Sequence, residues 1–113
     1  MTEAADRRWY AVRCVFTVGW PPDAVGKTYE ERITLWLADS ADEAIERAEA
    51  EAEQYAAEIN DAPSTYLGLA QSFRLFDAPT DGAEIFSLMR DSELPADDYL
   101  STFFATGSER LQT

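Results

Sequence analysis

The sequence predicts an α+β two-layer sandwich, in which a four-stranded, mainly antiparallel sheet packs on one long helix in the order β-β-α-β-β-α. Three observations lead to this fold class. Several segments alternate apolar and polar side chains with the period of a strand. One capped, alanine-rich segment repeats its apolar residues with the period of a helix. No internal repeat or linker divides the 113 residues, so we expect a single domain, 1–113, with an ordered core over 9–105.

The first two predicted strands are residues 9–18 and 29–38. Alternate side chains of the first strand form an apolar face that holds Tyr10, Val12, Cys14, Phe16 and Val18. The second strand places Ile33, Leu35 and Leu37 on one face, and its other face holds Glu30, Arg32, Thr34 and Trp36. Trp20-Pro21-Pro22 in the loop between them ends the first strand, because proline has no N–H to donate. We expect the two strands to pair antiparallel.

Residues 40–59 form the clearest element, a helix. Ser40 and Glu43 make a capping box at its start. The apolar side chains behind the cap recur with the helical period, and they are Ile45, Ala48, Ala52, Tyr55, Ala56 and Ile59. Asn60-Asp61-Ala62-Pro63 ends the helix, since a residue that precedes proline disfavours the helical conformation.

The second half of the chain supplies two more predicted strands and a short helix. Residues 66–76 alternate again, and residues 84–90 follow the turn at Asp81-Gly82 and form the fourth strand. The short helix begins at Pro95, which suits a first helical turn, and ends near Gly107. The predicted core consists of Val12, Cys14, Phe16, Leu35, Leu37, Leu69, Phe73, Ile45 and Tyr55.

The chain is strongly acidic, with 22 acidic and 9 basic side chains and a formal charge of −13. Such a protein binds nucleic acid poorly, because phosphate binding requires Lys and Arg to replace counterions. The absence of histidine excludes His-based catalysis and His metal sites, and the single Cys14 excludes an intramolecular disulfide. No catalytic, cofactor or metal motif is present, so no such residue is expected. Without an apolar segment of signal-peptide or membrane-span length, we expect a cytoplasmic location and no membrane partner.

Two predicted surfaces are candidates for binding a protein, and the first is acidic. Residues 39–61 carry nine acidic side chains and one basic side chain. Four of the acids follow the helical period and form a stripe, which consists of Asp42, Glu46, Glu49 and Glu53. The stripe is either a solvated face of an acidic protein or a docking surface for a basic partner. Divalent-metal binding is the least favoured alternative, because one helical stripe does not enclose a cation.

The second candidate is the sheet face that strand parity turns away from the helix. It carries aromatic and Arg residues, the types that dominate binding hot spots, and they are Trp9, Arg13, Arg32, Trp36, Tyr66, Arg74 and Phe76. Either the C-terminal helix with Phe103 and Phe104 covers this face, or the face is a dimer or partner interface. From it we take Trp9, Arg13, Arg32 and Trp36 as partner-binding candidates beside the four acids of the stripe.

Four segments carry a family resemblance. They are Trp9-Tyr10-Ala11-Val12-Arg13, Tyr29-Glu30-Glu31-Arg32-Ile33, the Ala38 to Ala44 segment that enters an Ala-Glu helix, and Asp81-Gly82-Ala83-Glu84-Ile85-Phe86-Ser87. Over residues 9–100 the chain resembles a family of small bacterial proteins catalogued as domain of unknown function 4288. The resemblance implies a bacterial α+β domain of this length. It carries no established activity and no site residue to transfer.

The function that the sequence favours is a non-catalytic, acidic protein-binding module. Its leading form is an immunity-protein or antitoxin-like inhibitor of a basic partner, because an acidic surface speeds association with a basic one. The alternative is a structural homodimer or an accessory subunit of a biosynthetic enzyme, which would use the sheet face. A small-molecule-binding protein or an enzyme ranks below both.

Overall fold

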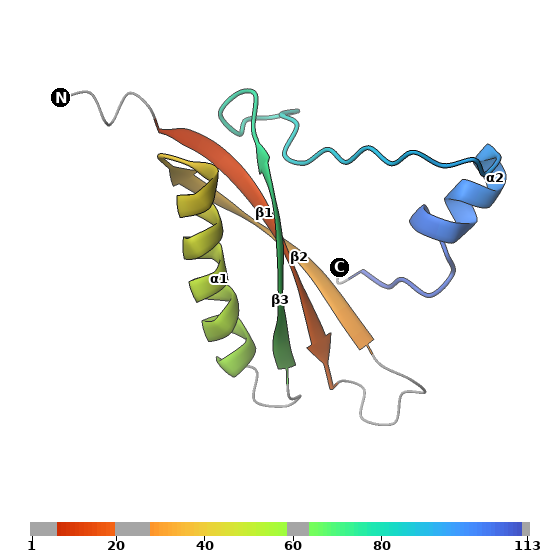
Figure 1. Ribbon diagram of the computed structural model, residues 1–113, viewed down its shortest axis with the longest axis horizontal. Helices are drawn as coiled ribbons and strands as arrows, with labels where there is room; N and C mark the ends of the chain where they lie inside the picture. The colour runs from red at the N-terminus through yellow and green to blue at the C-terminus, as the bar shows by residue number, and fades with distance from the viewer. Residues whose placement is uncertain (1–6, 20–27, 59–63, 112–113) are drawn as a thin grey trace.

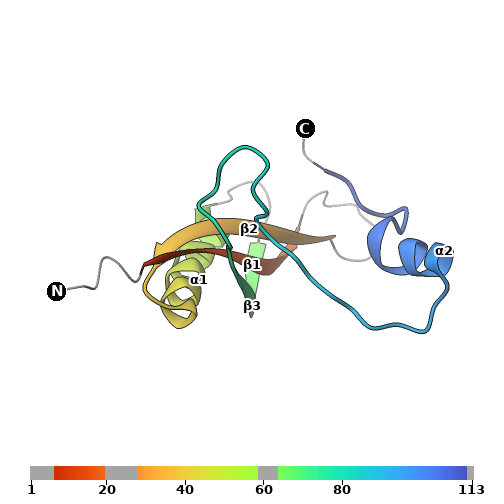
Figure 2. The same cartoon turned by 90° about the horizontal axis from the view of Figure 1, so that it is seen from above.

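The computed structural model describes residues 7–19, 28–58 and 64–111. Its main body is a three-stranded antiparallel sheet in the order β2-β1-β3, with one long helix on one face (Figures 1 and 2). The strands are β1 (Arg8–Val18), β2 (Thr28–Ala38) and β3 (Ser64–Arg74), and the long helix is α1 (Ala41–Glu58). A short helix, α2 (Ala96–Tyr99), continues into a wider helical turn, η2 (Leu100–Phe104). Trp20-Pro21-Pro22 and the predicted end of the long helix at 59–63 lie outside the described residues.

The predicted four-stranded sheet is wrong, and the order of elements is β-β-α-β-α. Residues 84–90, the predicted fourth strand, run without regular structure towards α2 (Figure 1). Their backbone makes no backbone hydrogen bond with another described residue. An alternating pattern makes a strand only where a neighbouring strand supplies hydrogen-bond partners, and within one copy no described strand pairs with this segment.

The pairing of β1 with β2 reverses the predicted facing of β2. Cys14, on the side of β1 that faces α1, lies opposite Arg32, so the polar parity of β2 shares the helix side of the sheet. Leu35 and Leu37, which were predicted to be in the core, lie on the opposite side, where Leu35 is 39% exposed. Register decides which face each residue takes, and a shift of one residue exchanges the faces.

The same reversal holds in β3. Tyr66 lies opposite Phe16 on the helix side, and the pairing of the two strands is irregular between Cys14 and Phe16. Gly68 lies in this irregular stretch with a φ of 78°, a left-handed conformation that glycine adopts without a Cβ clash. Leu69 is 62% exposed, so its predicted place in the core is wrong.

The core lies between α1 and the helix side of β1. Four alanines at every fourth position of α1 line it, and they are Ala44, Ala48, Ala52 and Ala56. Their small side chains let the helix approach the sheet closely, and Val12 and Phe16 are completely buried beneath it. Tyr55 packs edge-on against Phe16, with ring centres 5.3 Å apart. The predicted core positions of Val12, Cys14 and Phe16 are confirmed, and Ile45 and Tyr55 pack at its margin.

The Ser40 half of the predicted capping box is confirmed, whereas the Glu43 side chain reaches one residue beyond the cap, to Asp39. The Ser40 hydroxyl accepts a hydrogen bond from the Glu43 N–H at 3.1 Å, and the Glu43 carboxylate accepts one from the Asp39 N–H at 2.6 Å. These two bonds satisfy amide donors that have no partner inside the helix, so the sequence itself sets where α1 begins.

Ala48→Leu will destabilise the protein, because the Ala48 side chain is 1% exposed and a leucine there would push α1 away from the sheet. We expect the free energy of unfolding to fall by about 1–3 kcal/mol. The control is Ala50→Leu, at an exposed position of the same helix, which should change it by less than about 0.5 kcal/mol. Urea unfolding followed by circular dichroism measures both. Equal losses in the two variants would contradict the alanine packing of α1.

Candidate functional site

A polar cluster joins β2 to α1 on the helix side of the sheet. Arg32 donates hydrogen bonds of 2.7 and 2.9 Å to the Glu51 carboxylate, and its guanidinium lies 3.8 Å from the centre of the Tyr55 ring. The Tyr55 hydroxyl donates to Glu30 at 3.0 Å. The bonds from Arg32 lower the pKa of the Glu51 carboxyl, while burial and the bond to Glu30 raise the pKa of Tyr55. The cluster fastens an edge strand to the helix.

Trp36 and Tyr66 face α1 as well. The Arg47 guanidinium lies 5.1 Å from the centre of the Trp36 ring, and the Trp36 indole N–H donates to Thr34 at 2.7 Å. The Tyr66 hydroxyl donates to Glu49 at 2.5 Å, and burial together with this bond raises the pKa of Tyr66. Four residues predicted on the outer face therefore lie on the helix side by strand pairing, and they are Arg32, Trp36, Tyr66 and Arg74.

The acidic stripe lies along α1 but is not uniform. Glu49 accepts a hydrogen bond from the Tyr66 hydroxyl and is partly buried. Asp42 is exposed, as are Glu46 and Glu53, and these three carboxylates form no ion pair with a described residue. The stripe therefore presents three carboxylates to solvent and uses the fourth to hold β3.

The side of the sheet opposite α1 is named the open sheet face. Alternate residues of the three strands form it, and they are Trp9, Ala11, Arg13, Val15, Glu31, Ile33, Leu35, Leu37, Leu69, Gln71 and Phe73. Trp9 and Arg13 lie here as predicted, whereas Phe73 was predicted to be in the core. The face has no helix over it, because α1 covers only the other side (Figure 2).

Arg13 is the polar centre of the open sheet face. Its Nε donates to Gln71 at 3.1 Å, and its guanidinium lies 3.5 Å from the Glu31 carboxylate. The charge of Arg13 is thus balanced by Glu31 on the same face. Gln71 is also exposed, and the large apolar side chains exposed on this face include Ile33 on β2 at 40% and Leu69 on β3 at 62%.

A shallow depression on the open sheet face is lined by Arg13, Val15, Glu31, Leu69 and Gln71 and has a volume of ≈ 100 Å³. Clefts that hold small ligands usually measure about 300–1,000 Å³. A surface with only this small depression, and with apolar side chains around one balanced ion pair, suits another protein better than a small ligand.

The C-terminal arm, residues 76–111, leaves the sheet and contains no buried residue. Phe86 joins it to the open sheet face, with its ring centre 5.8 Å from that of Phe73 and 5.1 Å from the Arg13 guanidinium. Beyond this point the arm turns away, and α2 and η2 contact only each other among the described helices and strands (Figures 1 and 2). The alternative that the C-terminal helix covers the open sheet face is therefore wrong within one copy.

The arm is held together at its far end by Arg90. Its guanidinium lies 4.3 Å from the centre of the Phe103 ring and donates to the Tyr99 hydroxyl at 2.9 Å. Even so, large apolar side chains are exposed along the whole arm, and they are Phe76, Ile85, Leu88, Met89, Leu94, Leu100, Phe103, Phe104 and Leu111. The arm is ordered around a cation–aromatic contact but leaves its apolar residues uncovered.

Sequence reasoning missed Gln71 and Glu31 as members of the open sheet face, and it missed Phe86 as the residue of the arm that packs on this face. Leu35 and Leu37 were assigned to the core because their parity in β2, which also holds Ile33, is the more apolar one. The sequence did contain a signal, because β2 has large apolar residues on both parities: Trp36 lies on one, and Leu35 and Leu37 lie on the other. Such a strand is apolar on both sides, and only its register with β1 shows which side meets the helix.

Three further features bear on what the chain can do. Within residues 7–19, 28–58 and 64–111, no group of three or more acidic or Cys side chains is placed to hold a metal ion. No described helix combines the length and the apolar character that crossing a bilayer requires. Burial raises the pKa of the Cys14 thiol, which keeps the thiol protonated in the core.

Glu51→Gln will remove a pH-dependent part of the stability. The pKa of Glu51 in the folded protein lies below its ordinary value of 4.5, so its ion pair with Arg32 stabilises the fold above that pH and is lost as the pH falls through the folded pKa. Because the pair is partly exposed, we expect a loss of about 1 kcal/mol at neutral pH that shrinks in acid. Thermal melting at pH 7 and well below the ordinary carboxyl pKa measures it.

The control for this variant is Glu53→Gln, which changes an exposed acid two residues away. Its stability should match that of the parent chain at both pH values, because it breaks no ion pair with a described residue. A constant difference between Glu51→Gln and the parent at both pH values would show that the Arg32 pair does not act as described.

Comparison of the chain with protein-family models, with curated proteins and with solved structures finds no match. The resemblance to the bacterial domain of unknown function 4288 family therefore stays a prediction. The arguments for a function rest on the open sheet face, the C-terminal arm and the acidic stripe.

Proposed function

We propose that the chain is a non-catalytic protein-binding module whose contact surface is the open sheet face together with the C-terminal arm. The observation that carries this proposal is that both parts expose large apolar side chains which no described residue covers. Leu69 on the sheet is 62% exposed, and Phe104 and Met89 on the arm are 75% and 94% exposed. Apolar surface on this scale marks a site that another protein covers.

The overall dimensions support the same proposal. The chain exposes 8567 Å², whereas a compact monomer of 12.7 kDa exposes about 6,200 Å². Its radius of gyration is 16.6 Å, against about 13 Å for a compact chain of this size. The arm, which stands beside the sheet instead of on it, contributes to both excesses (Figure 2). A surface that a folded domain leaves uncovered in this way is suited to association.

The distribution of charge supports contact through the open sheet face. Its one close ion pair, Arg13 with Glu31, is balanced, so burying this face would not isolate a net charge. The exposed carboxylates Asp42, Glu46 and Glu53 belong to α1, on the opposite side of the sheet. Contact through the open sheet face would leave these acids in water.

A second candidate function uses the acidic stripe. Its three exposed carboxylates, Asp42, Glu46 and Glu53, have no partner in an ion pair among the described residues. They favour a basic protein as partner, as in an immunity-protein or antitoxin-like inhibitor, and association would be fast and sensitive to salt. An accessory role beside a biosynthetic enzyme would instead use the open sheet face.

Capture experiments with two paired variants separate these surfaces. We expect Leu35→Lys combined with Leu69→Lys to lose the proteins captured by the tagged parent chain, a differently tagged copy of the chain included, because lysine cannot be buried in an apolar contact without cost. Glu46→Gln combined with Glu53→Gln is the matched control on α1 and should keep them. The yield of each captured protein at low and high salt is the measurement.

Two results would count against this assignment. If the lysine variant captures the same proteins at the same yield, the open sheet face is not the contact surface. If only the glutamine variant loses a basic protein, and high salt releases that protein from the parent, then the acidic stripe is the functional surface.

A further inference from the structure

We infer that the partner covering the open sheet face is a second copy of this chain. The C-terminal arm of each copy lies on the open sheet face of the other copy. This inference rests on the proposed function and names its partner. The exchange would be reciprocal, since a two-fold dimer uses the same surfaces on both copies. The occupant is thus the part of the other copy's arm that lies beyond its Phe86 contact, residues 87–104.

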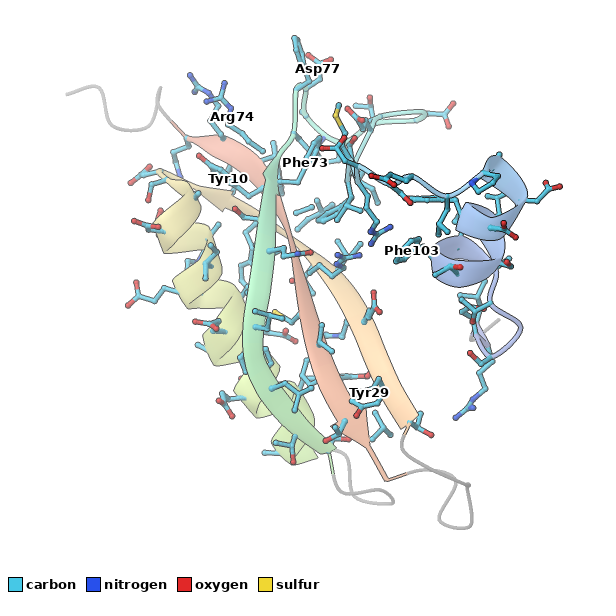
Figure 3. The ribbon with its side chains drawn as sticks, turned by 45° about the vertical axis from the view of Figure 1, so that its right-hand side comes forward. Tyr10, Tyr29, Phe73, Arg74, Asp77 and Phe103 are labelled. Carbon is cyan, nitrogen blue, oxygen red and sulfur yellow. The ribbon has the colours of Figure 1, made fainter. Side chains whose placement is uncertain are left out.

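The arm does not complete its own sheet. It touches the open sheet face through Phe86, beside Phe73 and Arg13, and α2 and η2 then reach no strand. Figure 3 shows Phe103 on the arm, well away from Tyr29 at the far end of the sheet. Tyr29 on the sheet is 57% exposed, and Phe103 on the arm is 43% exposed. The sheet and the arm therefore each expose apolar side chains of the kind that would bury those of the other.

Residues 84–90 of the arm have the apolar pattern of a strand but make no backbone hydrogen bond with another described residue. Ile85 and Leu88 are 46% and 43% exposed in this segment. A strand-like segment that leaves its domain without a partner is the kind of element that protomers exchange.

The exposed surface of the chain is also large compared with the area that a dimer interface buries. The exposed surface exceeds that of a compact monomer by about 2,300 Å². A stable dimer of ordinary size buries about 800 Å² on each copy. The excess over the whole chain is larger than that area, and the exposed apolar side chains of the open sheet face and the arm are the part of it that such an interface would bury.

The electrostatics favour a second copy over a basic protein. In one copy, α1 lies on the side of the sheet away from the open sheet face (Figure 2). Two copies that meet through their open sheet faces would therefore hold their α1 helices, with the exposed Glu46 and Glu53, on opposite outer sides. Charges separated by more than about 8 Å are largely screened at physiological salt. Each copy still carries −13, so salt should strengthen self-association, whereas salt weakens binding to a basic protein.

Sedimentation equilibrium of the full chain over a wide range of concentration tests the inference. We expect a species of twice 12.7 kDa whose dissociation constant falls as salt is raised. Leu35→Lys with Leu69→Lys alters the face, and Phe103→Ser with Phe104→Ser alters the arm. Each pair should weaken the dimer at least about tenfold. Circular dichroism melting verifies that the variants fold, and Glu46→Gln with Glu53→Gln is the control that keeps the dimer.

Mixing the two variants tests the exchange itself. The face variant has an intact arm and the arm variant has an intact face, so a mixed dimer contains one complete contact and each variant alone contains none. We expect the mixture to associate more strongly than either variant. A mixture that associates no better than its components would overturn the exchange of arms.

A parent chain that stays at 12.7 kDa at every concentration and salt would overturn the second copy as partner. The proposed function would survive that result if the lysine variant still lost a captured protein of another kind. The proposed function would fail, independently of the dimer, if the lysine variant had the same sedimentation mass as the parent chain and captured the same proteins.

Discussion

The close packing of one alanine-lined helix on one side of the sheet is the constraint on which the rest of the structure depends. Ala44, Ala48, Ala52 and Ala56 bring α1 down onto Val12 and Phe16. A single helix covers a single face of a sheet, so this packing builds one core and leaves the other face open. The chain that follows β3 does not return to close it, because α2 and η2 contact no strand. What the protein can bind follows from that asymmetry.

The same packing explains why polar side chains stand on the helix side of β2. Arg32 and Glu30 would be costly there without partners, but Glu51 and Tyr55 of α1 supply them. In exchange, the Ile33 and Leu35 parity of β2 faces outward. The network therefore fixes β2 to the helix and at the same time places apolar side chains on the open sheet face, which links the stability of the fold to its capacity for association.

Sequence reasoning predicted what local patterns determine and failed where pairing decides. The Ser40 cap of α1 and the apolar face of β1 are local, and both are confirmed. The facing of β2 and β3 depends on register across the sheet, which alternation within one strand does not specify, and so Leu35 and Leu69 were misplaced. Residues 84–90 have a strand pattern but no neighbouring strand within one copy. Trp9 and Arg13 were placed correctly because β1 has one clearly apolar parity.

The central claim is that the open sheet face and the C-terminal arm form a contact surface that a second copy of the chain covers. Hydrogen exchange of the amides of residues 84–94, measured in dilute and in concentrated protein, tests it most directly. In dilute protein these amides should exchange rapidly, since they have no backbone partner among the described residues. In concentrated protein they should become protected, while exchange in α1 stays unchanged. Rapid exchange of this segment at every concentration would contradict the account.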